Sequence, residues 1–171
     1  MALLEAIKNR YSVRSYLEKP VEKEKIDIIL ESARLAPSAK NFQDWRFIVV
    51  QDRLLKMRLV EAANNQAFVG NAPVVIVCCS VEPDYVMRCG QPVCSIDAAI
   101  ALEHIALQAV EEGLGTCWVG SFYEDKVKAI FDIPGKVRVV QLMTLGYPAN
   151  KHPGHNRMPI DSIVSHDKWA F

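Results

Sequence analysis

Hydrophobic residues along this chain repeat with two periods, which together predict an alternation of helices and strands. After Pro20, four apolar residues recur at spacings of three and four among charged neighbours: Ile26, Ile29, Leu30 and Ala33. This spacing places them on one face of a helix, which should end before Pro37 because proline disfavours a helical conformation in the preceding residue. A shorter helix is expected to start at residues 3–7 and to end at the segment 11–16.

Short apolar runs predict four strands, at residues 46–51, 74–79, 116–119 and 137–145. Three more helices are expected between them: 52–62 with Asp52 as N-cap, 96–112 capped by Ser95 and ended by Gly113, and 124–131 with acidic residues in its first turn. The helix at 96–112 is apolar on almost every side, which is typical of a helix in a core or a subunit interface. The order of these elements predicts a mixed α/β sandwich.

A chain of 171 residues with 50% hydrophobic residues is expected to form one domain, residues 1–171. The pattern changes after Pro148, because residues 149–171 show no helical stripe and end with Trp169 and Phe171 near the terminus. Two large aromatic side chains need apolar surface to cover them, and the body of a small domain offers little. We therefore expect this tail to lie on a partner subunit.

The charge balance argues against two classes of partner. Twenty Lys and Arg residues offset twenty Asp and Glu residues, so the net charge does not favour nucleic acid or an anionic membrane. Glu5 interrupts the N-terminal apolar run, which therefore lacks the core of a signal peptide, and no other segment approaches the roughly 20 apolar residues that span a bilayer. A cytoplasmic protein that binds small molecules or other proteins is expected.

The cysteines also favour a reducing compartment. Cys78, Cys79 and Cys117 lie in apolar runs, which predicts buried free thiols. Cys89 and Cys94 form a C-x4-C pair that lacks two further ligands at metal spacing, so no metal site is expected.

The segment 36–45 combines helix-breaking, amide and aromatic residues at a predicted helix-to-strand corner. Open α/β sheets often hold ligands at such corners. Ser38, Asn41 and Gln43 offer hydroxyl and amide groups that suit a flat heteroaromatic edge, and their spacing alone does not specify the ligand.

Arg10 and Arg14 flank Ser12 where the first predicted helix ends. Two forked guanidinium groups with a hydroxyl between them can grip a phosphate, and the alternative for each arginine is a solvated surface cation. His155 and Arg157, in the loop 154–159, are candidates for a third side of this clamp.

Acid/base machinery is scarce in the sequence. The usual motifs of serine hydrolases, nucleotide hydrolases, metalloproteases and simple dinucleotide binding are absent, and His104 in the apolar helix is expected to be a hydrogen-bonded core residue. This pattern is typical of a protein whose reactivity comes from a cofactor.

Four segments resemble the nitroreductase family of FMN-dependent flavoproteins, and they span nearly the whole chain. Residues 10–16 resemble the family segment R-R-S-x-R-x-F, residues 36–45 resemble A-P-S-x-x-N-x-Q-P-W, and residues 113–122 resemble G-L-G-T-x-W-x-G-x-F. Residues 145–148 and a late basic residue, Arg157, follow in the same order. The resemblance implies an α+β fold: a three-layer α/β/α sandwich with a mixed, mainly antiparallel sheet. It also implies a homodimer in which the tail 149–171 extends onto the partner subunit.

The resemblance further implies FMN as the cofactor and NAD(P)H as the electron donor. Arg10, Ser12 and Arg157 would hold the FMN phosphate, and Arg14 would lie by the N1/O2 edge, where its charge favours the reduced ring. Asn41 and Gln43 would bind the polar edge of the ring or the ribityl chain. The residues 37–39 would face the ring of the partner subunit, and backbone N–H groups at residues 120–121 would approach N5. The implied cofactor-binding set is Arg10, Tyr11, Ser12, Arg14, Pro37, Ser38, Ala39, Asn41, Gln43, Val119, Gly120, Ser121, His155 and Arg157.

The implied activity is hydride transfer from NAD(P)H to flavin N5, followed by reduction of nitroaromatic, quinone or similar small electrophiles in a ping-pong mechanism. No side chain is needed as a catalytic residue, since the chemistry takes place on the flavin. Reductive dehalogenation, flavin cleavage and a flavin-binding module without turnover are the alternatives.

Two departures from the family pattern bear on the site. Asp44 replaces the usual proline before Trp45, and it would either make the reduced ring harder to hold or pair with a neighbouring arginine. The region between Cys79 and Ser95, where larger members carry a lid, holds only a brief polar loop. An open, permissive pocket over the flavin is therefore expected.

Overall fold

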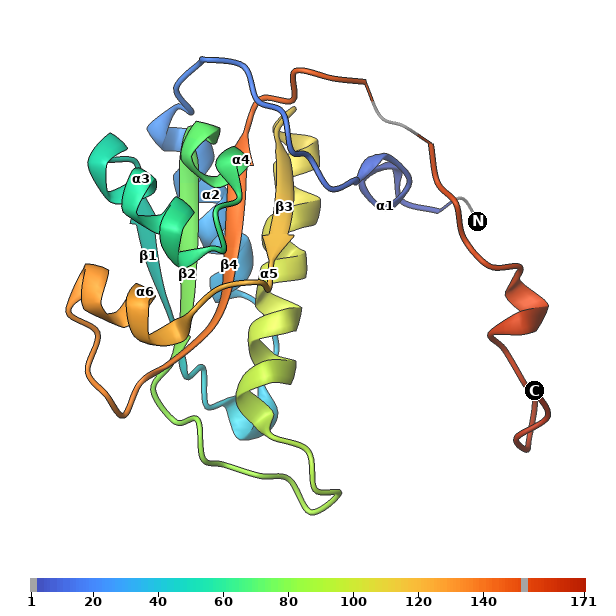
Figure 1. The fold of residues 1–171 in the computed structure, drawn as a ribbon. Helices are drawn as coiled ribbons and strands as arrows, with labels where there is room; N and C mark the ends of the chain where they lie inside the picture. The colour runs from blue at the N-terminus through green and yellow to red at the C-terminus, as the bar shows by residue number, and fades with distance from the viewer. Residues whose placement is uncertain (1–2, 152–153) are drawn as a thin grey trace.

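The computed structural model describes residues 3–151 and 154–171, so Met1, Ala2 and the predicted tail residues His152 and Pro153 lie outside the described residues. Its middle layer is a four-stranded antiparallel sheet with the order β1-β2-β4-β3 (Figure 1). The strands are β1 (Trp45–Val50), β2 (Val74–Ser80), β3 (Gly115–Val119) and β4 (Arg138–Gly146). Each strand boundary lies within one residue of its predicted position.

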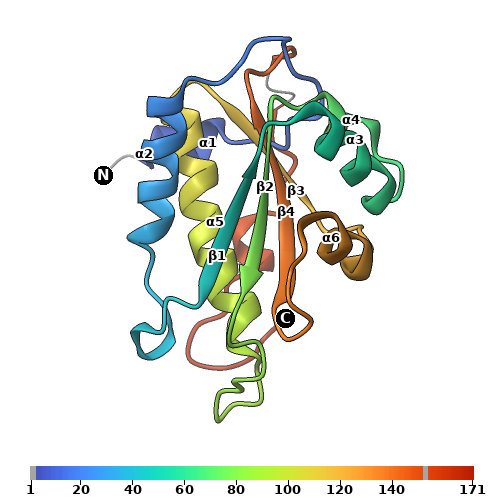
Figure 2. The same cartoon turned by 90° about the vertical axis from the view of Figure 1, so that its left-hand side faces the viewer.

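Helices cover both faces of the sheet, as Figure 2 shows. One face carries α2 (Lys23–Arg34) and α5 (Val93–Glu111), and the other carries α3 (Arg53–Ala62), α4 (Ala67–Asn71) and α6 (Glu124–Phe131). The helix α1 (Glu5–Asn9) lies outside α5, and two short 3-10 helices occupy Ala39–Asn41 and Ile160–Ser162. The predicted three-layer α/β/α sandwich is confirmed. The three strand pairings of the sheet are antiparallel, and a parallel contact is found in an isolated bridge between Ser12 and Thr116.

The central strand β2 explains why its sequence is apolar without alternation. Every residue of β2 is buried. Its even-numbered residues from Val74 to Cys78 pack against α2 and α5, and the odd-numbered residues from Val75 to Cys79 pack against α3 and α6. A strand between two helical layers buries both faces, so both sets of positions are hydrophobic.

Helix α5 begins earlier than predicted, at Val93, and Pro92 occupies its N-cap position. The prediction that Ser95 caps this helix is therefore wrong. Val93 is buried, and its N–H donates to the Tyr85 carbonyl at 3.0 Å, which satisfies one of the N–H groups that a capping side chain would otherwise serve. In contrast, Asp52 caps α3 as predicted, with Oδ1 accepting from the Leu55 N–H at 2.9 Å.

Two other helices differ from the sequence prediction. Helix α1 starts at Glu5, so Leu3 and Leu4 precede it and are exposed. Helix α4 was not predicted, because it has only five residues and one buried apolar side chain, Val69. A single turn of this kind is too short to show a hydrophobic period.

Among the described residues, α5 is long and apolar enough to cross a membrane by length and composition. The prediction that no segment approaches that length is therefore wrong for this helix. Half of its most apolar stretch is buried inside the fold, against the sheet and α2, which is the environment of a core helix.

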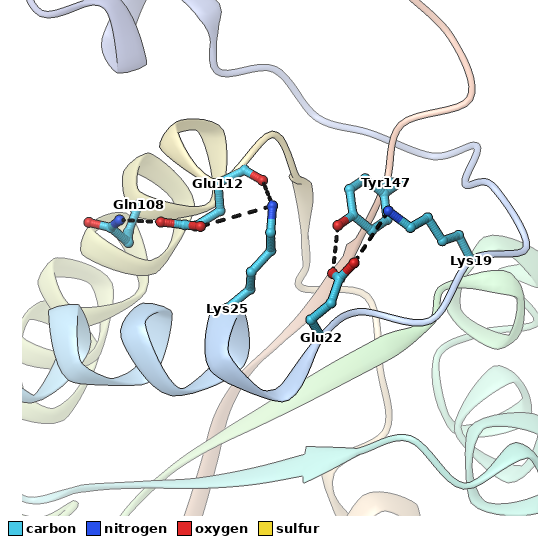
Figure 3. Close-up of polar contacts among 6 residues, drawn as sticks. All are labelled: Lys19, Glu22, Lys25, Gln108, Glu112 and Tyr147. Atoms are coloured by element: carbon cyan, nitrogen blue, oxygen red, sulfur yellow. Dashed lines mark hydrogen bonds and ion pairs between the residues drawn. The ribbon is translucent and has the colours of Figure 1, made fainter.

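A polar network joins the start of α2 to the end of α5 and to the chain after β4 (Figure 3). The Tyr147 hydroxyl donates to Glu22 at 2.6 Å, and Lys19 lies 3.3 Å from the same carboxylate and 3.8 Å from the centroid of the tyrosine ring. Lys25 donates to the backbone carbonyl of Glu112. The Tyr147–Glu22 and Lys25–Glu112 contacts connect segments more than 80 residues apart in the sequence.

Replacing Tyr147 by phenylalanine is expected to raise the pKa of Glu22 from about 2 towards about 4.3, because the tyrosine hydrogen bond is the main cause of its depression. A carboxyl group with a depressed folded pKa stabilises the fold above its unfolded pKa and loses that contribution as the pH falls through the folded value. The stability difference between wild type and Tyr147→Phe should therefore shrink between about pH 4.3 and about pH 2.

A titration of the glutamate carboxyl groups by NMR measures this shift. Tyr123→Phe is the matched control, since Tyr123 is exposed and lies before α6, away from Glu22. An unchanged Glu22 pKa in Tyr147→Phe would contradict the role given to the hydroxyl.

Candidate functional site

The segment containing Arg10, Ser12 and Arg14 lies directly beside β3. The Val13 N–H donates to the Thr116 carbonyl at 2.9 Å, and Ser12 forms the parallel bridge with Thr116. This close approach requires a glycine at the start of β3. A Cβ atom on Gly115 would lie 2.3 Å from Cγ2 of Val13, far inside van der Waals contact.

The three polar side chains of this segment differ in exposure and partners. Ser12 and Arg14 are exposed, and the guanidinium of Arg14 lies 6.0 Å from the centroid of the Phe68 ring on α4. Arg10 is half-buried, and its Nε is 3.8 Å from a Glu103 carboxylate oxygen on α5. Burial raises the pKa of Glu103, and the nearby Arg10 charge opposes that rise.

The beginning of the tail runs along the same segment. The Ala149 N–H donates to the Ser15 carbonyl at 2.9 Å, and the Tyr11 hydroxyl donates to the Asn150 carbonyl at 2.5 Å. A ring nitrogen of His155 is hydrogen-bonded to the Lys8 carbonyl, which brings His155 next to the arginine segment. The described hydrogen bond of Arg157 is to the carbonyl of its neighbour Asn156, so this structure does not bring Arg157 onto Arg10 or Ser12.

A second group of predicted site residues lies at the end of β3. Val119 is buried, whereas Gly120 and Ser121 are exposed. The Gln66 side chain donates to the Ser121 carbonyl at 3.0 Å and so ties this turn to the start of α4. Gly120 also lines a cavity of about 650 Å³, whose wall includes Ser95 and the basic side chain of Arg138.

The predicted ligand corner is a tightly wound loop. Three of its residues have left-handed backbone conformations: Lys40 (φ 50°), Asn41 (φ 57°) and Gln43 (φ 50°). The Gln43 N–H donates to Ser38 Oγ at 3.0 Å, and the Gln43 side chain donates to the Asn41 carbonyl at 3.2 Å. Strained backbone held by such contacts is typical of binding sites.

Asp97 attaches this corner to helix α5. Its buried carboxylate accepts from the Ala39 N–H at 3.0 Å, and burial raises its pKa while that hydrogen bond opposes the rise. Asp44, the departure from the family pattern, is also buried and accepts a hydrogen bond from the Ser80 hydroxyl at the end of β2. Among the described residues no arginine pairs with Asp44, so the pairing considered from the sequence is not found.

The arginine segment and the corner lie on different sides of α5. Glu103 contacts the first and Asp97 the second. Six residues along an α-helix correspond to about 9 Å of rise and to directions about 120° apart. In the described part of the chain, no hydrogen bond or ion pair joins the two groups. Within one copy of the chain, the two groups of predicted site residues therefore lie apart.

Sequence reasoning missed the two carboxylates that contact these groups, Asp97 at the corner and Glu103 beside Arg10. Asp97 and Glu103 are the acidic residues of α5 before its last turn, and an acid in a mostly apolar helix is a signal that could have identified them. The prediction of buried thiols is confirmed, since Cys78, Cys79 and Cys117 are free and buried, as is Cys94. His104 has the predicted hydrogen bond, to the Ser32 carbonyl at 3.1 Å, but it is half-buried and not a core residue.

Comparison with known proteins gives a consistent match. The sequence profile described as Nitroreductase family matches residues 7–69 and 55–147. A protein of Methanothermobacter thermautotrophicus, provisionally named NADH dehydrogenase/NAD(P)H nitroreductase, is 38% identical over 99% of this chain and 88% of its own length.

Solved structures match the fold over almost the full chain. A nitroreductase family protein from Clostridium difficile 630 is 33% identical, with a TM-score of 0.87 over 99% of this chain and 100% of its own. An FMN-dependent nitroreductase from Clostridium difficile R20291 is 32% identical, with a TM-score of 0.79 over 97% of this chain and 96% of its own.

Proposed function

This chain belongs to the nitroreductase family, and on that basis we propose that it is an FMN-dependent oxidoreductase that uses NAD(P)H. It would take hydride from the nicotinamide and reduce nitroaromatic, quinone or similar small electrophilic acceptors in a ping-pong mechanism. The observation that carries the proposal is the placement of Arg10, Ser12 and Arg14 on one extended segment against β3.

The donors of this segment fit a phosphorylated flavin. Arg14 has no carboxylate partner among the described residues, and Arg10 has only the long contact with Glu103. Charged guanidinium donors and a hydroxyl match the oxygens of a phosphate and the carbonyl edge of a flavin ring. FMN, when bound, would supply the hydride acceptor of the reaction, and the charge of Arg14 would favour the ring that carries extra electrons.

The other half of the site would come from a second copy of the chain. The corner at residues 37–43 lies on a different side of α5 from the arginine segment of its own chain, which supports a site completed by two subunits. Apolar side chains that a partner would cover support the same proposal. Trp169 is 83% exposed and meets the exposed Phe171 ring edge-on, and Leu3 and Leu4 are exposed beside α1. We place this homodimer in the cytoplasm.

An absorption spectrum of the purified protein, before and after incubation with FMN, tests the proposal. A bound flavin spectrum that bleaches on anaerobic addition of NADH or NADPH, and returns with a nitroaromatic compound or a quinone, is the expected result. Protein that is colourless and stays colourless after incubation with FMN would contradict it. Reduction only at the rate of free FMN would instead favour a flavin-binding module without turnover.

A further inference from the structure

A cluster of one cation and two aromatic rings lies where the ligand corner meets the loop before α5. The ring of Phe42 meets the ring of Tyr85 edge-on, with centroids 5.0 Å apart. The Lys40 ammonium lies 4.7 Å from the Tyr85 centroid and 5.8 Å from the Phe42 centroid. The family pattern does not require these three residue types. Lys40 and Phe42 stand at variable positions of the segment 36–45, and Tyr85 lies in the short loop between Cys79 and Ser95, outside the four segments that resemble the family.

The charge of Lys40 is not neutralised within the described structure. Across residues 3–151 and 154–171, no carboxylate forms an ion pair with its ammonium group. Lys40 is exposed, and Phe42 is 43% exposed although it is a large apolar side chain. The exposed Phe42 ring and the Lys40 ammonium over the Tyr85 ring together form an accessible surface. This surface can bind a ligand that has both an aromatic ring and a negative charge.

Both sides of this cluster are held in place by backbone contacts. Lys40 and Phe42 belong to the strained corner that Asp97 fixes to α5. Tyr85 lies in the loop before α5, where its carbonyl accepts from the Val93 N–H at 3.0 Å. The same loop is closed by the Met87 N–H donating to the Gln91 carbonyl at 2.9 Å. A preformed cluster loses little conformational entropy when a ligand binds.

We infer that Lys40, Phe42 and Tyr85 select aromatic electron acceptors that carry a negative charge, such as an aromatic carboxylate. The ammonium group would pair with the carboxylate, and the two rings would contact the acceptor ring. The inference rests on the proposed function, because the corner would face the flavin of the partner subunit. It departs from the open, unselective pocket expected from the sequence.

Equilibrium dialysis of benzoate and benzamide with the FMN-loaded protein tests the inference without turnover. The two compounds have the same ring and differ in charge. Lys40→Gln should lower the preference for benzoate over benzamide by roughly five-fold, the size expected of one partly exposed charge pair. Lys40→Arg should keep the preference for benzoate, and Tyr85→Leu should weaken the binding of both compounds.

Lys126→Gln is the matched control, because the Lys126 ammonium lies 4.9 Å from the Tyr123 centroid in a similar exposed pair on another surface. An unchanged preference in Lys40→Gln, or an equal loss in Lys126→Gln, would overturn the inference. The same protein assayed with NADH, NADPH and a neutral quinone separates this result from the proposed function. If the protein turns over and the benzoate preference is unchanged in Lys40→Gln, only the inference is contradicted. If NADH and NADPH do not reduce the flavin, the proposed function is contradicted.

Discussion

Replacing Arg10 by alanine is expected to weaken FMN binding by roughly ten- to a hundred-fold, because a hydrogen bond to a charged group contributes about 1.5–3 kcal/mol. Arg10 is the half-buried cation of its segment, and its only described ion pair is the 3.8 Å contact with Glu103. Its guanidinium is therefore available to a phosphate. Quenching of flavin fluorescence in a titration of the apoprotein measures the change. Arg58→Ala is the control, since Arg58 is an exposed arginine on α3.

Glu103→Gln should have the opposite effect on the same titration. Its carboxylate lies near the cation that would bind the phosphate, so removing the negative charge while keeping the shape should tighten FMN binding by roughly two- to ten-fold. Glu111→Gln, an exposed acid at the end of α5, serves as the control. Weaker FMN binding in Glu103→Gln would show instead that this carboxylate positions Arg10, and would contradict a competition between Glu103 and the phosphate for Arg10.

Gly115→Ala is expected to destabilise the fold by about 1–3 kcal/mol and to displace the arginine segment, because overpacking a tight contact forces its neighbours to move. The new Cβ would lie 2.3 Å from Cγ2 of Val13 and 3.0 Å from Cγ of Pro148. Val13 is buried and is hydrogen-bonded to β3, so it cannot move without carrying Ser12 and its neighbours with it. Urea unfolding and the FMN titration together measure both effects.

Two further variants make the Gly115 prediction specific. Gly135→Ala should leave stability and FMN binding nearly unchanged, because nothing lies within 4 Å of its Cβ position. Adding Val13→Ala to Gly115→Ala removes the atom at 2.3 Å and should restore part of the FMN affinity. Wild-type affinity in the single variant Gly115→Ala would mean that the close packing of this segment on β3 does not position the cofactor site.

Hydrophobic periodicity predicted most elements because it reflects burial directly. The positions of the strands β1 to β4 and of the helices α2, α3 and α6 could be predicted from the residues of each element alone. Each of them buries one or both faces against a neighbouring layer, and that burial sets the spacing of its hydrophobic residues. The start of α5 could not be predicted in this way, because the Tyr85 carbonyl that accepts the hydrogen bond from the Val93 N–H is eight residues away and belongs to a loop. The local signal of Ser95 was therefore misleading.

The candidate site was only partly predictable, because several of its contacts join residues that are distant in the sequence. Arg10, Ser12 and the corner residues could be identified from short motifs, because each motif is contiguous in the chain. The partner of Asp44 could not, since Ser80 lies 36 residues away on the next strand. The contact of Lys40 with Tyr85 likewise depends on how the loop before α5 folds back onto the corner.

The sequence by itself determined the succession of helices and strands, the family, and the residue types that suit a phosphorylated flavin. These properties depend on local spacing and on the chemistry of single side chains. Only the tertiary structure decided that Glu103 lies near Arg10, that Asp97 holds the corner, and that the arginine segment and the corner lie on different sides of α5. Such contacts join residues tens of positions apart, so they are set by the packing of the layers around one helix and not by any single segment.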